Sequence, residues 1–364
     1  MDLPVNPPVA PMLAKAVTAV PAQPDSDPVW SYEPKWDGFR ALVFRDGDEV
    51  AISSRGGKDL ARYFPELVEA ARQELPERVV LDGEVGVPRN VSTGERIRRL
   101  DWDSLSQRIH PAASRIAKLS EETPAIFIGF DALASGDRAL LDEPFAVRRE
   151  VLAESVRAGA DSRFLLSRVT RDAAQAQDWF TAFEGAGLDG VVAKKLAASY
   201  VPGKREMVKV KHKRTADCVV LGYRVHKSGT GLGSMLLGLY DDAGEVRMVG
   251  GSSAFSDAKR IELQQEFEKL RLSPDAVSPG EVNRWRSSAQ GAKGAGQSQS
   301  ATGEWIPIRQ ELVAEVAYDQ MENGRFRHTV KFVRWRPDRE PSSCTYDQLE
   351  VPLTYDLYDV IEGV

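Results

Sequence analysis

The stretch SYEPKWDGFR, residues 31–40, places a long cationic side chain, Lys35, between a proline and a Trp-Asp-Gly turn. Pro34 has no N–H and biases the residue before it toward extended geometry. Asp-Gly is a strong turn signal, so Lys35 is the last residue before a sharp bend. A cation held at such a bend, with Arg40 five positions later, could neutralise a phosphate. That chemistry needs partners from elsewhere in the chain.

Six further short signals supply such partners. Most of them lie at expected strand ends or adjoining turns, where side chains can converge on a cleft. Together they contain several cations, at least three carboxylates and an aromatic ring, a combination that suits a polyphosphate, a divalent metal and a stacked base. The signals are SSRGG (53–57), LDGEV (81–85), GFDAL (129–133), LDGVVAK (188–194), VKVK (208–211) and RWRPDR (334–339).

The elements that carry these signals alternate between strand-like and helix-like patterns in the first two-thirds of the chain. Residues 41–54 read as a hairpin, and residues 59–75 have helical apolar spacing that begins at Asp59, the expected N-cap. Mixed hairpins and helices predict an α+β fold with a mixed or antiparallel sheet. Further strands are expected at 78–87, 125–133, 188–195 and 206–212, and further helices at 145–159 and 171–187.

The pattern changes after Lys213. Three strands (215–227, 233–243, 245–253), a helix at 256–271 capped by Ser256, and two strands (312–321, 325–335) follow in order. This order is expected of a small all-β OB barrel with one helix. We therefore predict a first domain at 1–212, an OB-fold domain at 213–345 and a C-terminal tail at 346–364, with a Gly/Ser/Gln loop at 287–303.

Bulk composition is that of an ordinary soluble globular protein. The 364 residues are enough for about two domains. The net charge of −6 argues against non-specific coating of nucleic acid, but it permits a locally basic groove. No secretory signal, membrane-length apolar run or disulfide framework is evident, and only two cysteines occur. A cytoplasmic protein without a membrane partner is expected.

The seven signals, in this order, resemble the covalent nucleotidyltransferase superfamily of ATP-dependent DNA ligases, RNA ligases and mRNA capping enzymes. The match to its K-x-D-G-x-R signature and later motifs covers roughly residues 10–340. PMLAKAV (11–17), SSRGGKDL (53–60) and the segment 317–339 look most like small stand-alone bacterial C-type ligases and the ligase module of bacterial end-joining enzymes. The resemblance implies a nucleotidyltransferase (adenylation) domain followed by an OB domain.

The resemblance also implies a role for each matching position. Lys35 would be the catalytic nucleophile that forms lysyl-AMP from ATP and expels pyrophosphate. Asp189, together with Glu84, would hold Mg²⁺ or Mn²⁺. The positions that match ATP- or AMP-binding residues are Glu33 (beside adenine), Arg40 and Glu84 (ribose), Arg55 (nucleotide or nick phosphates), Phe130 (stacked on adenine), Lys209 and Lys211 (closing on the nucleotide, Lys211 at the α-phosphate), and Arg336 and Arg339 (pyrophosphate).

Two positions depart from the family pattern. Asp189 stands where glutamate is usual, and Arg339 stands where the last motif commonly has lysine. Both changes keep the charge. Ordinary structural roles remain open for several other residues: Phe130 could be plain core, Asp82 and Asp131 could shape turns or pair with arginines, and Lys194 could be a solvated strand end.

The leading functional hypothesis is an ATP-dependent DNA ligase that seals 5′-phosphate/3′-hydroxyl nicks in DNA repair. Its expected partners are nicked duplex DNA, bound with strong salt dependence, and DNA repair proteins. A monomer associated with the nucleoid is expected. The alternatives are an RNA ligase or capping-type guanylyltransferase with the same lysine chemistry, and an OB-type nucleic-acid binder with a degenerate nucleotide pocket.

Overall fold

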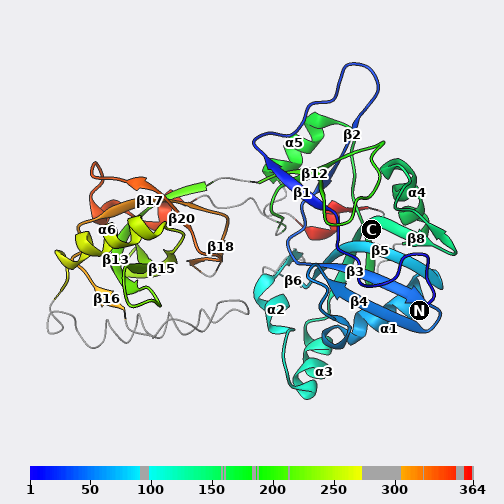
Figure 1. Cartoon of the computed structure of the whole chain (residues 1–364), viewed down its shortest axis with the longest axis horizontal. Coiled ribbons are helices and arrows are strands. Elements are labelled where there is room, and N and C mark those ends of the chain that lie inside the picture. Colours follow the sequence, from blue (N-terminus) through cyan, green and yellow to red (C-terminus); the bar gives the residue numbers. More distant parts are fainter. Residues whose placement is uncertain are drawn as a thin grey trace. The chain divides into compact units, whose positions relative to one another are not determined.

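The chain forms two compact units (Figure 1), which are Met1–Lys211 with Pro352–Val364, and His212–Val351. The segment Pro352–Val364, within the region expected to be a tail, therefore groups with the first unit. The expected loop at 287–303 lies outside the described residues. The computed structural model describes residues 1–90, 98–156, 159, 161–182, 186, 188–211, 214–272, 305–322, 324–349 and 356–362.

The first unit contains a four-stranded sheet built from distant parts of the sequence. Its strands in spatial order are β1 (Leu13–Val17), β12 (Arg205–Val210), β11 (Val191–Lys195) and β2 (Trp30–Pro34). β1 runs parallel to β12, and β11 pairs antiparallel with both β12 and β2. Because alternate residues of a strand share a face, Arg205, Met207 and Lys209 project to the same side of β12.

A second sheet of seven strands forms the centre of the same unit. The predicted hairpin is confirmed as β3 and β4, which turn at Gly47 with a φ of 59°. In spatial order the strands are β21 (Ile361–Glu362), β10 (Phe164–Ser167), β8 (Ile126–Ser135), β5 (Arg78–Gly86), β3 (Phe39–Asp46) and β4 (Glu49–Ser54), with β9 (Arg138–Ala139) beside β8.

Both faces of the second sheet are buried. Ala41 and Val43 of β3 pack into an apolar cluster that includes the helix residue Leu67, whereas Leu42 belongs to a cluster that includes Met207 of the first sheet. Alternation along β3 therefore directs even-numbered residues toward the first sheet. The helices of the first unit are α1 (Pro65–Glu74), α2 (Trp102–Gln107), α3 (Ala113–Glu122), α4 (Phe145–Ser155) and α5 (Ala173–Ala182), with 3₁₀ turns η1 (Ala61–Tyr63) and η6 (Leu357–Val360) and the small hairpin β6 (Pro88–Asn90) and β7 (Arg98–Leu100).

One helix prediction is wrong at its start. The segment expected to form a single helix behind Asp59 instead forms η1 and then α1, which begins at Pro65. Proline is compatible with the first position of a helix but not with its interior, because it lacks the N–H and clashes with the preceding turn. Asp59 accepts a hydrogen bond from the Ala61 N–H, so it supports the short turn rather than the helix.

The second unit has the predicted OB order. Ser256 caps its helix by accepting a hydrogen bond from the Lys259 N–H. A parallel bridge between Ser252 and Val330 links the two ends of the strand order and closes the barrel. The elements are β13 (Arg214–Val225), β14 (Leu232–Tyr240), β15 (Val246–Ser252), α6 (Asp257–Glu268), β16 (Ile306–Pro307), β17 (Val313–Tyr318), β18 (Met321–Glu322), β19 (Arg325–Phe326) and β20 (Lys331–Trp335), followed by 3₁₀ turns η4 (Pro341–Ser343) and η5 (Tyr346–Gln348).

The last predicted strand, 325–335, is divided in two. β19 pairs with β18 across a turn at Gly324 (φ 73°), whereas β20 pairs with β17. The break follows from this change of partner, which an apolar alternation pattern does not report. Across the described parts of both units, no helix is long and apolar enough to cross a membrane.

Gly190 should be irreplaceable in the first unit. Its φ is +125°, and a Cβ added there would lie 2.0 Å from the Val210 carbonyl oxygen. We expect Gly190→Ala to destabilise the first unit by about 3 kcal/mol, from backbone strain plus displacement of β12. Gly47→Ala is the matched control, because Gly47 also has positive φ but open space around its Cβ position. Thermal unfolding of the two variants should differ clearly, and equal unfolding temperatures would contradict the steric argument.

Candidate active site

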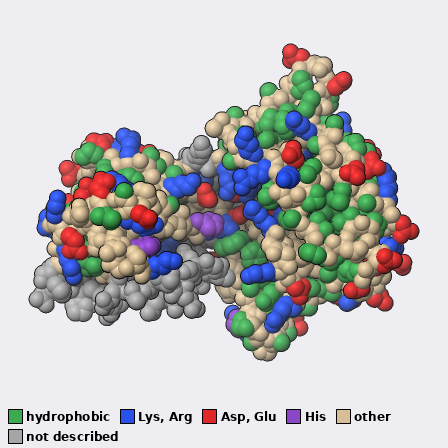
Figure 2. Space-filling model, in the orientation of Figure 1, with side chains coloured by type: hydrophobic (Ala, Val, Ile, Leu, Met, Phe, Trp, Pro, Cys, Tyr) green, Lys and Arg blue, Asp and Glu red, His purple; other side chains and the backbone are tan. Residues whose placement is uncertain are grey.

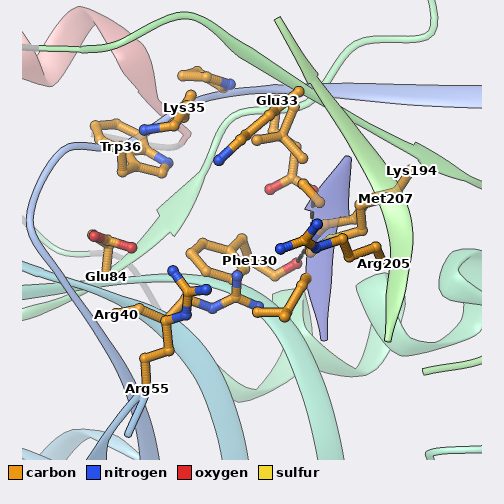
Figure 3. Close-up of a pocket in the computed structure, with 15 residues that line it drawn as sticks. Glu33, Lys35, Trp36, Arg40, Arg55, Glu84, Phe130, Lys194, Arg205 and Met207 are labelled. Carbon is orange, nitrogen blue, oxygen red and sulfur yellow. Dashed lines mark hydrogen bonds and ion pairs between the residues drawn. The ribbon is translucent and has the colours of Figure 1, made fainter. Parts of the chain in front are cut away.

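A pocket of about 230 Å³ lies between the two sheets of the first unit (Figure 3). Phe130 lies in the middle of this view, with Arg40 and Arg55 on one side and Glu33 on the other. The alternation of β12 and β3 explains why both sheets contribute side chains. The pocket is lined by Leu13, Ala14, Glu33, Pro34, Lys35, Trp36, Arg40, Arg55, Glu84, Phe130, Val192, Lys194, Arg205, Met207 and Lys209.

Lys35 is held in place by its own backbone. It follows β2 directly; its N–H donates to the Gly190 carbonyl at 2.8 Å, and its carbonyl accepts from the Asp189 N–H at 2.9 Å. This reciprocal pair places the Lys35 and Asp189 side chains together. The Lys35 ammonium donates to Asp189 Oδ2 at 2.7 Å, and its side chain is 18% exposed.

Lys211 contacts the same carboxylate oxygen, with its Nζ 2.6 Å from Asp189 Oδ2. Burial alone would raise the pKa of Asp189, but the charges of Lys35 and Lys211 offset it, so the pKa lies below its ordinary value. Burial lowers the pKa of Lys209, and the nearby charges of Lys35 and Lys211 lower it further. Three lysines thus concentrate positive charge around one carboxylate, which suits a polyphosphate ligand.

Glu84 faces the pocket in a different electrostatic environment. Its Oε1 accepts a hydrogen bond from the Gly38 N–H at 3.1 Å. Burial raises the pKa of Glu84 to about 7, although Lys35 and Arg40 act in the opposite direction. Asp189 and Glu84 therefore differ, since Asp189 is ionised at neutral pH and Glu84 is poised to gain a proton.

Arg40 is positioned by a buried carboxylate. Its Nε and one terminal nitrogen donate to the two Asp82 oxygens at 2.8 and 2.6 Å. Asp82 also accepts from the Tyr200 hydroxyl at 2.6 Å, which fixes the carboxylate from behind. The Arg40 guanidinium lies 4.8 Å from the centre of the Phe130 ring, a cation–π distance. Asp82 is thus an arginine partner, one of the structural roles left open from sequence.

A second buried ionic network lies at the opposite side of Phe130. The Lys194 ammonium lies 2.6 Å from Glu33 Oε1, donates to the Phe130 carbonyl at 2.8 Å, and lies 4.8 Å from the centre of its ring. Asp131 pairs with Arg148, which is fully buried. Burial raises the pKa of Glu33, and Lys194 counteracts the shift. The reading of Lys194 as a solvated strand end is wrong, because its side chain is 3% exposed.

Phe130 belongs both to the pocket lining and to an apolar core cluster, with 8% of its surface exposed. Arg205 is a pocket residue that sequence reasoning missed. It precedes Lys209 by four residues on one strand, so the two-residue alternation of β12 could have found it. Trp36, Met207 and Lys194 also line the pocket.

Arg336 and Arg339 belong to the second unit. Arg336 donates to both Asp217 oxygens at 3.1 and 2.9 Å and also pairs with Asp338. The neighbouring Asp338 raises the pKa of Arg336 above its ordinary value. Arg339 Nε lies 3.5 Å from Asp217. These two arginines therefore share Asp217 within their own unit.

Asp189 and Glu84 are the two carboxylates that the family resemblance assigns to a divalent cation. No group of three or more His, Cys, Asp or Glu side chains that could hold a metal occurs among the residues that the structure describes. Asp189 Oδ2 already contacts the ammonium groups of Lys35 and Lys211, which a cation bound at this oxygen would have to displace. Metal binding by Glu84 and Asp189 therefore stays a prediction.

Comparison with known proteins identifies the family to which the chain belongs. Residues 11–211 match the family model "ATP dependent DNA ligase domain", and residues 228–339 match "ATP dependent DNA ligase C terminal region". The chain belongs to the ATP-dependent DNA ligase family. The family and fold expected from the motif order are thereby confirmed.

Individual ligases show how far the likeness extends. The chain is 61% identical to DNA ligase C1 of Mycolicibacterium smegmatis, with 100% of this chain and 99% of that protein covered. It is 30% identical to the multifunctional non-homologous end joining DNA repair protein LigD of Mycobacterium tuberculosis, covering 92% of this chain and 39% of that protein. A solved Lig E DNA ligase shares the fold at 16% identity, with a TM-score of 0.52 over 89% of this chain and 99% of that one.

The ionisation of Glu84 should be visible as a pH dependence of ligase stability. A carboxyl whose pKa rises from 4.5 to about 7 on folding stabilises the protein fully below about pH 4.5, and this contribution is lost as the pH rises through about 7. Glu84→Gln resembles the protonated form, so the unfolding free energy of the wild type should fall relative to it by up to about 3 kcal/mol between pH 4.5 and 8. The measurement is the free energy of unfolding in denaturant, followed against pH for the wild type and for Glu84→Gln. If the two free energies change in parallel with pH, the raised pKa of Glu84 is contradicted.

Proposed function

We propose that this ligase seals nicked duplex DNA through a covalent adenylate on Lys35. The Lys35 nitrogen attacks the α-phosphorus of ATP; a nitrogen–phosphorus bond forms, the bond to pyrophosphate breaks, and the amine loses a proton. The adenylate then passes to the 5′-phosphate of a nick, and the 3′-hydroxyl displaces AMP. The observation that carries this proposal is the Lys35 amine, oriented by Asp189 at a pocket lined by cations and one aromatic ring.

The pocket supports a division of roles in the first step. Phe130 offers a ring for adenine, with Glu33 beside it, and Arg40 and Glu84 are close to where a ribose would lie. Lys209 and Lys211 would bind phosphates, with Arg55 at the exposed side. The lowered pKa of Asp189 makes it a poor proton acceptor, so its proposed role is to orient Lys35 until a phosphate replaces it as the partner of Lys211.

A divalent cation would have to arrive with the nucleotide. Mg²⁺ is commonly held by one or two carboxylates together with substrate phosphates and water rather than by protein alone. Mg²⁺ or Mn²⁺ bound in this way would neutralise phosphate charge. Glu84 and Asp189 are the proposed carboxylates, but only after Asp189 exchanges its lysine partners.

The proposal extends to the second unit and to DNA. We assign adenylation to the first unit and place the proposed pyrophosphate-orienting arginines, Arg336 and Arg339, on the OB unit. Because both contact Asp217 in this structure, they would need to exchange that partner to reach a phosphate. Figure 2 shows Lys and Arg side chains gathered on the first unit near β1 and β12, a suitable surface for a DNA backbone.

The cellular setting is also a proposal. LigD, one of the relatives, is named for non-homologous end joining and DNA repair. A role for this ligase in DNA repair, as a monomer acting with repair proteins at the nucleoid in the cytoplasm, is consistent with that relationship.

ATP labelled at its α-phosphate tests the covalent step. Wild-type protein with Mg²⁺ or Mn²⁺ should become labelled, and Lys35→Ala should show a loss of label of at least about 10³-fold because no other amine is aligned with the phosphorus. Lys118→Ala, at an exposed helix position, is the control and should label normally. An unlabelled wild type, or labelling that persists in Lys35→Ala, refutes the proposal.

Substrate comparison separates the DNA ligase from its alternatives. We expect labelling with ATP but not GTP, and sealing of nicked DNA in preference to nicked RNA. Affinity for the nick should fall about 10³-fold or more between 50 and 200 mM salt, because phosphate contacts release counterions. Equal labelling by GTP, or preferred sealing of RNA, would favour a capping-type enzyme or an RNA ligase instead.

A further inference from the structure

The chain returns to the first unit after completing the second. Residues 356–362, here called the return segment, comprise η6 (Leu357–Val360) and β21 (Ile361–Glu362). They belong to the same compact unit as Met1–Lys211 although 140 residues of the other unit separate them in sequence, His212–Val351. Figure 1 shows this red C-terminal segment among the strands of the first unit.

Apolar side chains anchor the return segment deeply. Leu357 and Val360 are 0% exposed and Ile361 is 1% exposed. These three side chains belong to the same apolar cluster as Trp36 and Phe130, two residues that line the nucleotide pocket. The return segment is therefore part of the support beneath that pocket rather than a surface appendage.

Polar contacts hold the start of the return segment in register. The Arg98 N–H donates to Asp356 Oδ2 at 2.9 Å, and the Arg98 guanidinium lies 3.6 Å from Asp356 Oδ1. The same guanidinium stacks 3.4 Å from the centre of the Tyr358 ring. Asp356 also accepts from the Tyr358 N–H, so it caps η6. Apolar, ionic and stacking contacts together specify one docked position.

The end of the return segment pairs with the strand that carries Ser167, and Ser167 is hydrogen-bonded to a residue of the pocket. β21 pairs antiparallel with β10, and Ile361 is directly opposite Ser167. The buried Ser167 hydroxyl accepts a hydrogen bond from the Trp36 indole N–H at 2.8 Å. Trp36 is the neighbour of Lys35 in the chain and lines the pocket. Without β21, β10 would be an edge strand with unpaired backbone groups beside this bond.

We propose that the return segment is a positioning element of the adenylation site, which holds Trp36 and Phe130 in the geometry that ATP and Lys35 require. This inference rests on the proposed lysine adenylation. Leu357, Val360 and Ile361 act through other residues and touch no substrate. All three are buried in the apolar cluster that contains Phe130 and Trp36, the residue that follows Lys35.

Full-length variants test the proposal. Ile361→Asp places a charge in the apolar cluster and should release the return segment, seen as faster hydrogen exchange in 356–362 and 164–167. The rate of Lys35 labelling at saturating ATP should fall at least tenfold, and the ATP concentration for half-maximal rate should rise at least fivefold. Asp359→Ala, an exposed position in the same turn, is the matched control and should stay within twofold of wild type.

The kinetic pattern distinguishes positioning from simple loss of folded protein. A smaller labelled fraction with an unchanged rate and unchanged ATP dependence would mean that the return segment only stabilises the fold, and the proposal would be overturned. Wild-type kinetics despite fast exchange in 356–362 would overturn it as well.

Ser167→Ala provides a second test if Ile361→Asp does not fold. This change keeps the β21 pairing but removes the acceptor of the Trp36 indole N–H. The ATP concentration for half-maximal labelling should rise at least threefold, and an unchanged value refutes the proposed link. Wild-type protein that fails to label would instead remove the proposed function itself, together with this inference.

Discussion

The Asp189 carboxylate is the interaction on which the arrangement of the pocket lysines depends. It binds two lysines through one oxygen, and its own backbone N–H bonds the carbonyl of one of them, Lys35. A flexible four-carbon side chain has substantial rotamer entropy, so Lys35, the proposed nucleophile, needs an oriented partner to occupy one position. Asp189 supplies that orientation. Because its pKa is depressed, it remains an anion while doing so.

The buried cations around Phe130 are also each paired with a carboxylate. On one side of Phe130, Arg40 donates hydrogen bonds to Asp82. On the other side, Lys194 forms an ion pair with Glu33 and donates to the Phe130 carbonyl. An isolated charge buried in this way would be costly, whereas a paired and hydrogen-bonded one is tolerated. These pairs place both cations against the Phe130 ring.

The order of the chain gives the ligase two covalent connections between its units. The first unit is completed only by residues that follow the OB unit, and these residues share an apolar cluster with the pocket floor. Formation of the complete first unit therefore depends on contacts between segments that are far apart in sequence. Loop-closure entropy makes such contacts late and costly to form, and deep burial of Leu357, Val360 and Ile361 offsets that cost.

The sequence by itself determined the family, the identity of the candidate nucleophile, the β3–β4 hairpin, the Ser256-capped helix and the order of the OB strands. These features depend on local signals: a turn dipeptide, a capping serine, apolar alternation, and motifs that keep their order. The structure brings the predicted residues of the first unit to one pocket and its rim, but Arg336 and Arg339 belong to the other unit.

Tertiary structure alone decided which cations are buried, which share a carboxylate, and which strands pair. Lys194 and Lys195 are adjacent and chemically identical, yet Lys194 is buried against Glu33 whereas Lys195, the last residue of β11, is exposed. The division of 325–335 between two partners and the docking of the return segment were likewise invisible in the sequence pattern. Burial and strand pairing depend on what lies opposite in space, and a local pattern carries no information about that.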